Sequence, residues 1–196
     1  MNSGTRSLAA GHAPGVPGSL PPVRTARPAA RRRAGRPLPR PWPLFSGLGP
    51  VGALPTAPGL ARGFTAMVLG GWDMASRGDL IDVSTLIVTE LSSNVVDRAT
   101  NADGSPVYQS DGRVAVLWLR LMTDRDALGI EIWDNLPPSA GVPVLRRPEA
   151  TEEHGRGLEL VQGLSRDWGW HPVPGKRAKC TWAVLDAGQR PVPVRG

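Results

Sequence analysis

Cysteine, histidine and long apolar runs are scarce or absent in this 196-residue sequence. Cys180 is the only cysteine, which excludes an intramolecular disulfide and a cluster of cysteine metal ligands. The three histidines, His12, His154 and His171, are too few to favour a histidine-rich zinc site. No stretch approaches the roughly 18 uninterrupted apolar residues of a membrane span. We therefore expect no transmembrane helix, no membrane partner and a cytoplasmic location.

Acidic residues are absent from the first 50 positions, which hold eight of the 23 Lys and Arg residues. The remaining 51–196 segment carries 15 basic and 17 acidic residues, so the net charge of +6 belongs to the N-terminal segment. The globular part therefore lacks the basic excess that favours nucleic-acid binding. Ala, Arg, Gly and Pro fill 32 of the first 50 positions. This composition predicts a disordered or polyproline-like tail over residues 1–43.

Three interpretations of this tail remain open. The run "RPAARRRAGRPLPR" is compatible with an arm that binds nucleic acid or another anionic surface. A twin-arginine export signal fits less well, because proline interrupts the apolar stretch that should follow the arginines. The third interpretation is a GC-rich coding region read from too early a start. We favour a dispensable tail without an assigned role, followed by one domain over 44–186 and a short C-terminal tail over 187–196.

The spacing of apolar residues predicts an α/β fold, a two-layer sandwich with helices on one face of a mostly antiparallel sheet. The expected helices are 58–74, 79–99 and 155–169, and the expected strands are 42–49, 113–123, 127–134 and 179–186, with a hairpin turn at "TDRDA". The apolar positions expected to face the core are Leu60, Phe64, Met67, Val68 and Trp72 in the first helix and Leu158, Val161, Leu164 and Trp168 in the third. The proline-containing loop 135–154 is long for a compact domain, which indicates a mobile functional segment.

The 79–99 helix raises a question, because its apolar face also carries Glu90 and Asn94. Both residues share a stripe of the helix with Val83 and Ile87. The flanking positions that broaden this stripe into a buried surface are Leu80, Leu86, Leu91 and Val95. Burying a carboxylate and an amide costs several kcal/mol unless a partner satisfies them. The two residues therefore lie at a solvated edge, cap a neighbouring loop, or bind a ligand.

Two further polar sites follow along the chain. Asp134 ends the 127–134 strand in register with the inward-facing Ile130 and Ile132, although a strand-end turn would also explain an aspartate there. Gly155 and Gly157 lie where the long loop enters a helix, so their backbone N–H groups are open to an anion. This short pattern is neither the dinucleotide-binding fingerprint nor a phosphate-binding P-loop.

Taken together, "VTELSSNVV" (88–96), "IEIWDNLP" (130–137), "GRGLELV" (155–161) and "CTWAVL" (180–185) resemble the GHKL superfamily of ATP-binding proteins. Within it, the sequence is similar to the anti-sigma regulatory factors of actinobacterial type, which are serine/threonine kinase-like. The likeness covers roughly residues 44–186. It implies a Bergerat-type ATP-binding fold with ATP and Mg²⁺ as ligands.

The resemblance also implies a role for each matching residue. Asn94 would bind Mg²⁺, which prefers oxygen ligands and keeps several waters. Glu90 would act as the base or orient water, and Asp134 would accept a hydrogen bond from the adenine amino group. The residues expected to line the phosphate and adenine sites are Gly155, Arg156, Gly157, Leu158 and Thr181. Arg146 and Arg147 in the loop are equally compatible with charge compensation and with a solvated surface.

The sequence departs from the family pattern at two places. The glycine that follows the strand-end aspartate by two positions is replaced, because Asp134 is followed by Asn135, Leu136 and Pro137. Position 98, often histidine in relatives, is Arg98. The family further implies a cytoplasmic protein kinase that phosphorylates an anti-sigma-factor antagonist, with a sigma factor as a second partner and a homodimer as a compatible assembly. The alternatives are a non-catalytic nucleotide-dependent binding module and a nucleic-acid-binding protein that acts through its tail.

Overall fold

The computed structural model describes residues 31–34, 38, 42–74, 78–136 and 157–188, the first of these ranges by its backbone alone. Within these ranges, no helix combines the length and apolar character that a bilayer span requires. Residues 137–154 of the expected loop, the C-terminal segment after 188 and most of the expected tail lie outside the described residues.

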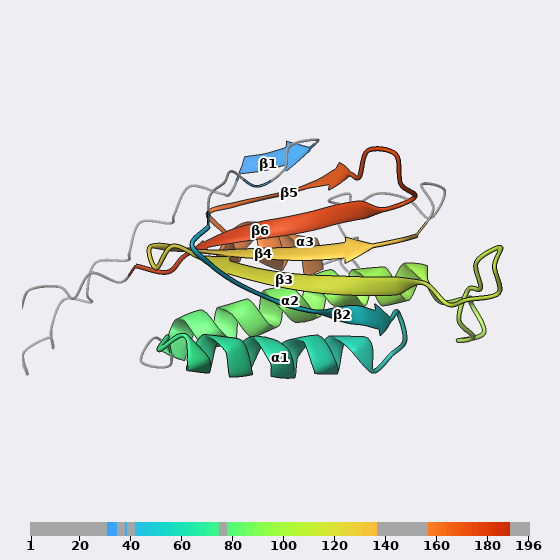
Figure 1. Ribbon diagram of the computed structural model, residues 1–196, viewed down its shortest axis with the longest axis horizontal. Coiled ribbons are helices and arrows are strands. Elements are labelled where there is room, and N and C mark those ends of the chain that lie inside the picture. Colours follow the sequence, from blue (N-terminus) through green and yellow to red (C-terminus); the bar gives the residue numbers. More distant parts are fainter. Residues whose placement is uncertain (1–30, 35–37, 39–41, 75–77, 137–156, 189–196) are drawn as a thin grey trace, which may run out of the picture.

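Six strands form one sheet in the order β1-β5-β6-β4-β3-β2. All neighbouring strands are antiparallel except β1 and β5, which are parallel. Figure 1 shows the sheet with its strands labelled. The elements are β1 (Arg31–Ala34), β2 (Leu44–Gly52), α1 (Ala57–Gly71), α2 (Gly78–Arg98), β3 (Val116–Thr123), β4 (Ala127–Asp134), α3 (Gly157–Leu164), β5 (Asp167–Pro172) and β6 (Lys179–Asp186).

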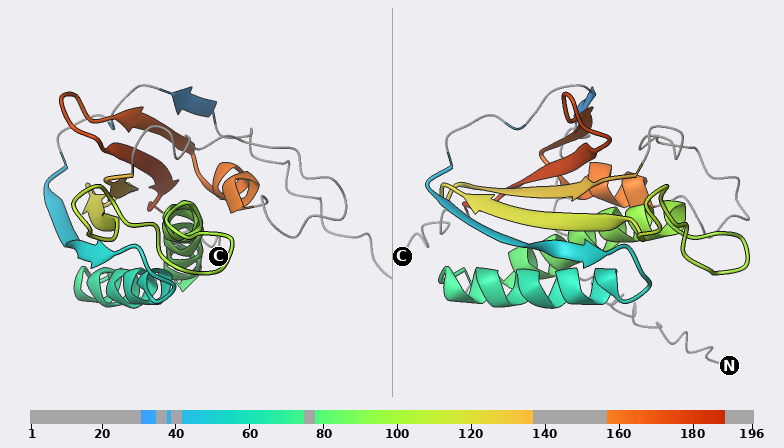
Figure 2. Two further views of the ribbon diagram at one scale, coloured as in Figure 1. Left: turned by 90° about the vertical axis from the view of Figure 1, so that its right-hand side faces the viewer. Right: turned by 45° about the vertical axis from the view of Figure 1, so that its right-hand side comes forward.

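The three helices cover one face of this sheet, which gives two layers (Figure 2). Alternate residues of the central strands point toward the helices, so Leu119 on β3 and Ile130 on β4 are fully buried in the main core. Ile87 and Leu91 on α2 meet them from the helix layer. The prediction of a two-layer sandwich with a mostly antiparallel sheet is confirmed.

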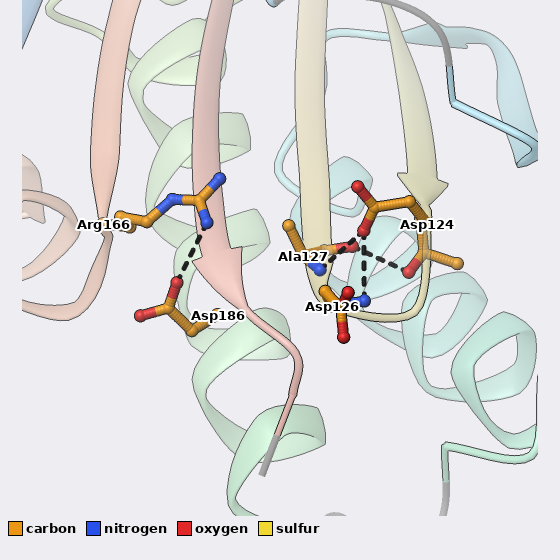
Figure 3. A network of polar contacts seen from close by, with 6 residues as sticks. Asp124, Asp126, Ala127, Arg166 and Asp186 are labelled. Atoms are coloured by element: carbon orange, nitrogen blue, oxygen red, sulfur yellow. Dashed lines mark hydrogen bonds and ion pairs between the residues drawn. The ribbon is translucent and has the colours of Figure 1, made fainter. Parts of the chain in front are cut away.

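The β3–β4 hairpin closes on the predicted "TDRDA" turn, where local hydrogen bonds fix the backbone (Figure 3). The Asp124 carboxylate accepts hydrogen bonds from the N–H groups of Asp126 and Ala127, at 3.1 and 2.8 Å. Arg125 adopts a positive φ of 75° between them. An aspartate that caps its own turn offsets the strain of that conformation, so this hairpin sets the register of β3 against β4.

A second, smaller apolar cluster lies on the opposite face of the sheet. It contains Cys180 and Trp182 from β6 and Met122 from β3, and burial raises the pKa of the Cys180 thiol. Leu38 is also buried in it, beside Trp42. The prediction of a disordered or polyproline-like tail over residues 1–43 is therefore wrong for Leu38. It is also wrong for Arg31–Ala34, which form strand β1. A strand needs only backbone partners, and one leucine can dock without any apolar periodicity around it.

The structure corrects three further expectations. The third helix ends at Leu164 rather than 169, and the chain continues into β5, where Trp168 pairs with Ala183 of β6. In α1, Leu60 and Met67 are exposed, because the small residues Ala57 and Ala61 face the core instead. Close helix–sheet packing favours such small side chains. Similarly, Leu86 of α2 is exposed although it lies next to the buried Ile87.

Candidate functional site

One face of α2 carries Glu90, Asn94 and Arg98, which follow one another at successive turns of the helix. The row spans about 12 Å along the helix axis. All three side chains are half-buried, because α2 packs against both α3 and β4. Glu90 and Asn94 are therefore partly solvated, at the edge of the interface that α2 makes with α3 and β4.

The carboxylate of Glu90 lies against the first residue of α3. A Cβ atom at Gly157 would overlap the Glu90 carboxylate, so glycine is what allows this close approach. Burial, and secondarily the negative charge of Asp97, raises the pKa of Glu90. Within the described residues the carboxylate accepts no hydrogen bond. The raised pKa makes Glu90 a stronger base than an ordinary glutamate.

The Asn94 side chain is oriented by the helix itself. Its Nδ2 donates a hydrogen bond to the main-chain carbonyl of Glu90 at 2.9 Å. This contact uses the donor end of the amide and leaves the oxygen Oδ1 without a hydrogen-bond partner in the described part of the chain. An amide oxygen is a suitable ligand for a hard cation such as Mg²⁺. The described ranges contain no cluster of three or more His, Cys, Asp or Glu side chains, so such a cation would take most of its ligands from phosphates and water.

Asp134 is fully buried at the end of β4. Its Oδ1 accepts hydrogen bonds from the ammonium group of Lys179, at 2.8 Å, and from the N–H of Leu136, at 3.1 Å. The other oxygen, Oδ2, is buried and has no hydrogen-bond partner among the described residues. The strand-end turn thus accounts for one oxygen only. A buried carboxylate oxygen without a donor is costly and indicates a partner outside the described residues.

The charges around Asp134 connect it to α2. Burial raises the pKa of Asp134, and the neighbouring Lys179 ammonium is the largest of the groups that oppose this effect. Arg98 also lowers it, which places the end of the α2 row within electrostatic reach of the strand end. Thr181 on β6 is buried on the same inner wall, opposite Ile132 of β4. Asp134 and Thr181 therefore form the wall at one end of the row, and Gly157 borders the other end.

The structure describes some of the predicted site residues and not others. Glu90, Asn94, Asp134, Gly157 and Thr181 surround the interface of α2 with α3 and the sheet end. The Leu158 side chain is buried in the main core, so only its backbone can meet a ligand. The residues that lie outside the described ranges are Gly155, Arg156, Arg146 and Arg147.

Lys179 belongs to the candidate site and was not predicted from the sequence. It is buried, with only 6% of its surface exposed, and forms the ion pair with Asp134. The alternation along β6 could have predicted that Lys179 faces inward, because residues 179, 181, 183 and 185 share one face of the strand. Comparison with known proteins adds no assignment: no protein-family model and no curated protein matches this chain.

Proposed function

We propose that this chain binds ATP with Mg²⁺ between α2, the start of α3 and the inner wall of β4 and β6. The observation that carries the proposal is the buried Oδ2 of Asp134, which has no hydrogen-bond donor among the described residues. The exocyclic amino group of adenine would donate to this oxygen. Guanine carries a carbonyl oxygen at the equivalent ring position and would leave the carboxylate unpaired, so the site should select adenine.

The other side chains fit the remainder of the nucleotide. The Asn94 oxygen would bind Mg²⁺, and bound Mg²⁺ would neutralise part of the phosphate charge. The backbone N–H groups of the first turn of α3 would donate to a phosphate oxygen at the positive end of the helix. Each of these groups belongs to a folded element, so their separations are set by the core.

We further propose that the protein is a serine/threonine kinase for an anti-sigma-factor antagonist. Glu90 would accept the hydroxyl proton of the partner's serine or threonine while that oxygen bonds to the γ-phosphorus and ADP leaves. The raised pKa of Glu90 supports this role, because a stronger base is better matched to neutral pH.

A nucleotide-dependent binding module without transfer is the second candidate, and one observation favours it. Asn135, in the segment where relatives carry a hinge glycine, is tied to β3. Its Oδ1 accepts a hydrogen bond from the Val116 N–H at 2.8 Å, and its own N–H donates to the Val116 carbonyl at 3.3 Å. The chain that leaves β4 is therefore anchored at its first residue, which limits hinge motion there.

Thermal unfolding with MgATP and MgGTP tests nucleotide binding. Because ATP binds only the folded state, about 100 times Kd should stabilise the protein by about 2.7 kcal/mol, with little effect of GTP. Asp134→Asn should abolish the ATP effect, since it retains an oxygen for Lys179 but presents an amide donor to the adenine amino group. Asp111→Asn, at an exposed loop residue, is the matched control. An unchanged melting temperature in millimolar MgATP would contradict the proposal.

Labelled ATP and purified antagonist proteins separate the two candidates. A kinase should place phosphate on serine or threonine of the partner, and Glu90→Gln should remove transfer while it retains ATP binding. Partner binding that depends on ATP but yields no phosphoprotein would instead establish the binding module.

A further inference from the structure

A second pocket lies on the face of the sheet opposite the helices. Its volume is about 530 Å³, within the range of small-molecule sites. Strands β2, β3 and β4 and the turn between β5 and β6 line it. It is separate from the candidate nucleotide site, because Trp133, which lines the pocket, and Asp134, which faces the helices, are consecutive on β4 and point to opposite faces.

Trp118 of β3 provides a flat aromatic wall. It lies directly opposite Trp133 in the β3–β4 register, and both indoles are half-buried. On its other side is Gly49 of β2, where a Cβ atom would come within 2.9 Å of the Trp118 ring. Gly47, two residues earlier, also lines the pocket. Gly49 therefore lets β2 pack directly against the Trp118 indole, where any larger residue would displace the ring.

Trp133 is held rigidly as the second wall. Its indole N–H donates a hydrogen bond to the Glu131 carboxylate at 2.9 Å. The guanidinium of Arg120 lies over the ring at 5.6 Å from its centroid, and His171 meets it edge-on at 5.7 Å. Glu131 also accepts a hydrogen bond from Arg120 Nε at 2.8 Å. These contacts fix the indole before any ligand arrives, which lowers the entropic cost of binding.

The rim of the pocket is positively charged. Lys176 and Arg177 are exposed in the β5–β6 turn, and none of the described residues that line the pocket is acidic. Arg120 is largely compensated by Glu131, so the net positive charge comes from the turn. Aromatic walls with cations at one side match a flat ring that bears an anionic group. We propose that this pocket binds a small planar aromatic anion.

The first test uses two fluorescent probes with the same aromatic skeleton, of which only one carries a sulfonate group. The anion 1-anilinonaphthalene-8-sulfonate should bind the folded full-length chain at one site, and neutral N-phenyl-1-naphthylamine should bind about tenfold more weakly. Trp118→Leu should weaken binding of the anionic probe roughly tenfold, through loss of stacking. Lys176→Ser/Arg177→Ser should weaken the anionic probe to a similar extent but leave the neutral one unchanged. Equal affinity for the two probes would overturn the proposal.

Matched substitutions at a distance serve as controls. Tyr108→Leu and Arg113→Ser remove an exposed aromatic residue and an exposed cation before β3, and both should leave probe binding unchanged. If Trp118→Leu fails to fold, the Lys176/Arg177 pair still decides the outcome, because both side chains are exposed. Two other occupants of the pocket, a single-stranded nucleic acid and a second copy of this chain, are tested in parallel. Displacement of the probe by a ten-residue oligothymidylate at a hundredfold lower concentration than by thymidine monophosphate would overturn the proposal. So would a dimer that is lost with Trp118→Leu.

Discussion

At the scale of single residues, the raised pKa of Glu90 has two causes, and a substitution can remove one of them. Burial is the larger cause of its raised pKa, and the charge of Asp97 is the smaller. A carboxyl group whose pKa is higher in the folded than in the unfolded state favours folding while it is protonated. That contribution is present at low pH and is lost as pH rises from the ordinary value of 4.5 through the raised one. At neutral pH, Glu90 therefore lowers the free energy of unfolding.

Asp97→Asn should shift the pH profile of phosphoryl transfer toward lower pH. The substitution removes a negative charge that disfavours ionisation of Glu90, so the base is deprotonated at a lower pH. Rates of transfer measured between pH 4 and 8, a window that we set about the unperturbed glutamate pKa, give the midpoint. Asp82→Asn, at an exposed position two turns before Glu90 on α2, is the control. A midpoint that moves equally in both variants would show that Asp97 has no specific effect.

At the scale of elements, the approach of α3 to α2 depends on the absence of a side chain at Gly157. Gly157→Ala should destabilise the protein by about 1 kcal/mol, the lower end of the cost of overpacking, because the new methyl group displaces the carboxylate end of the flexible Glu90 side chain. Glu90→Ala should relieve this overlap, so the double variant should regain stability relative to Gly157→Ala alone. Chemical denaturation of the three variants gives the comparison.

Gly163, also in α3, provides the internal control. A Cβ atom there meets no other atom within 4 Å, so Gly163→Ala should stabilise the helix by about 0.5–1 kcal/mol. If Gly157→Ala were also stabilising, the close contact between α3 and Glu90 would be disproved.

The elements also show what sequence patterns can and cannot predict. Strand β6 was predicted with its observed bounds, because a short apolar run that follows the "PVPGKRA" turn is typical of a buried strand. Strand β5 was missed, because Trp168 continues the helical spacing of Leu158, Val161 and Leu164. Only its pairing with β6, a long-range interaction, decides that Trp168 belongs to a strand. In the same way, the positions of Glu90, Asn94 and Asp134 were predictable from periodicity, whereas the ion pair of Asp134 with Lys179 depends on strand register.

At the scale of the whole molecule, the N-terminal segment contributes to the fold through Leu38. Its side chain is 5% exposed in the outer cluster, where it packs over Gly129. Leu38→Ala should therefore lower the free energy of unfolding by about 2–5 kcal/mol, as for other buried leucines. Urea denaturation measures the loss. A change within ±0.5 kcal/mol, as at an ordinary surface position, would show that the tail is dispensable through residue 40.

Deletion of residues 1–30 is the matching control, since it retains β1 and Leu38. We expect this deletion to leave both stability and ATP binding unchanged. The deletion retains the arginines at 31–33, 36 and 40, so replacing these five by serine tests the nucleic-acid alternative for the tail. DNA binding that depends steeply on salt and is lost in that variant would support the alternative.

The alternation along β4 has a consequence for how this gene can vary. Trp133 and Asp134 serve the two candidate sites from opposite faces, and Glu131 and Ile132 repeat the arrangement one step earlier. Inserting or removing a single codon within this strand would exchange the two faces, so that a tryptophan would meet the helices and an aspartate the outer pocket. Both sites would be lost in one event. We therefore expect natural variants to differ in the length of their loops, while the length of β4 stays constant.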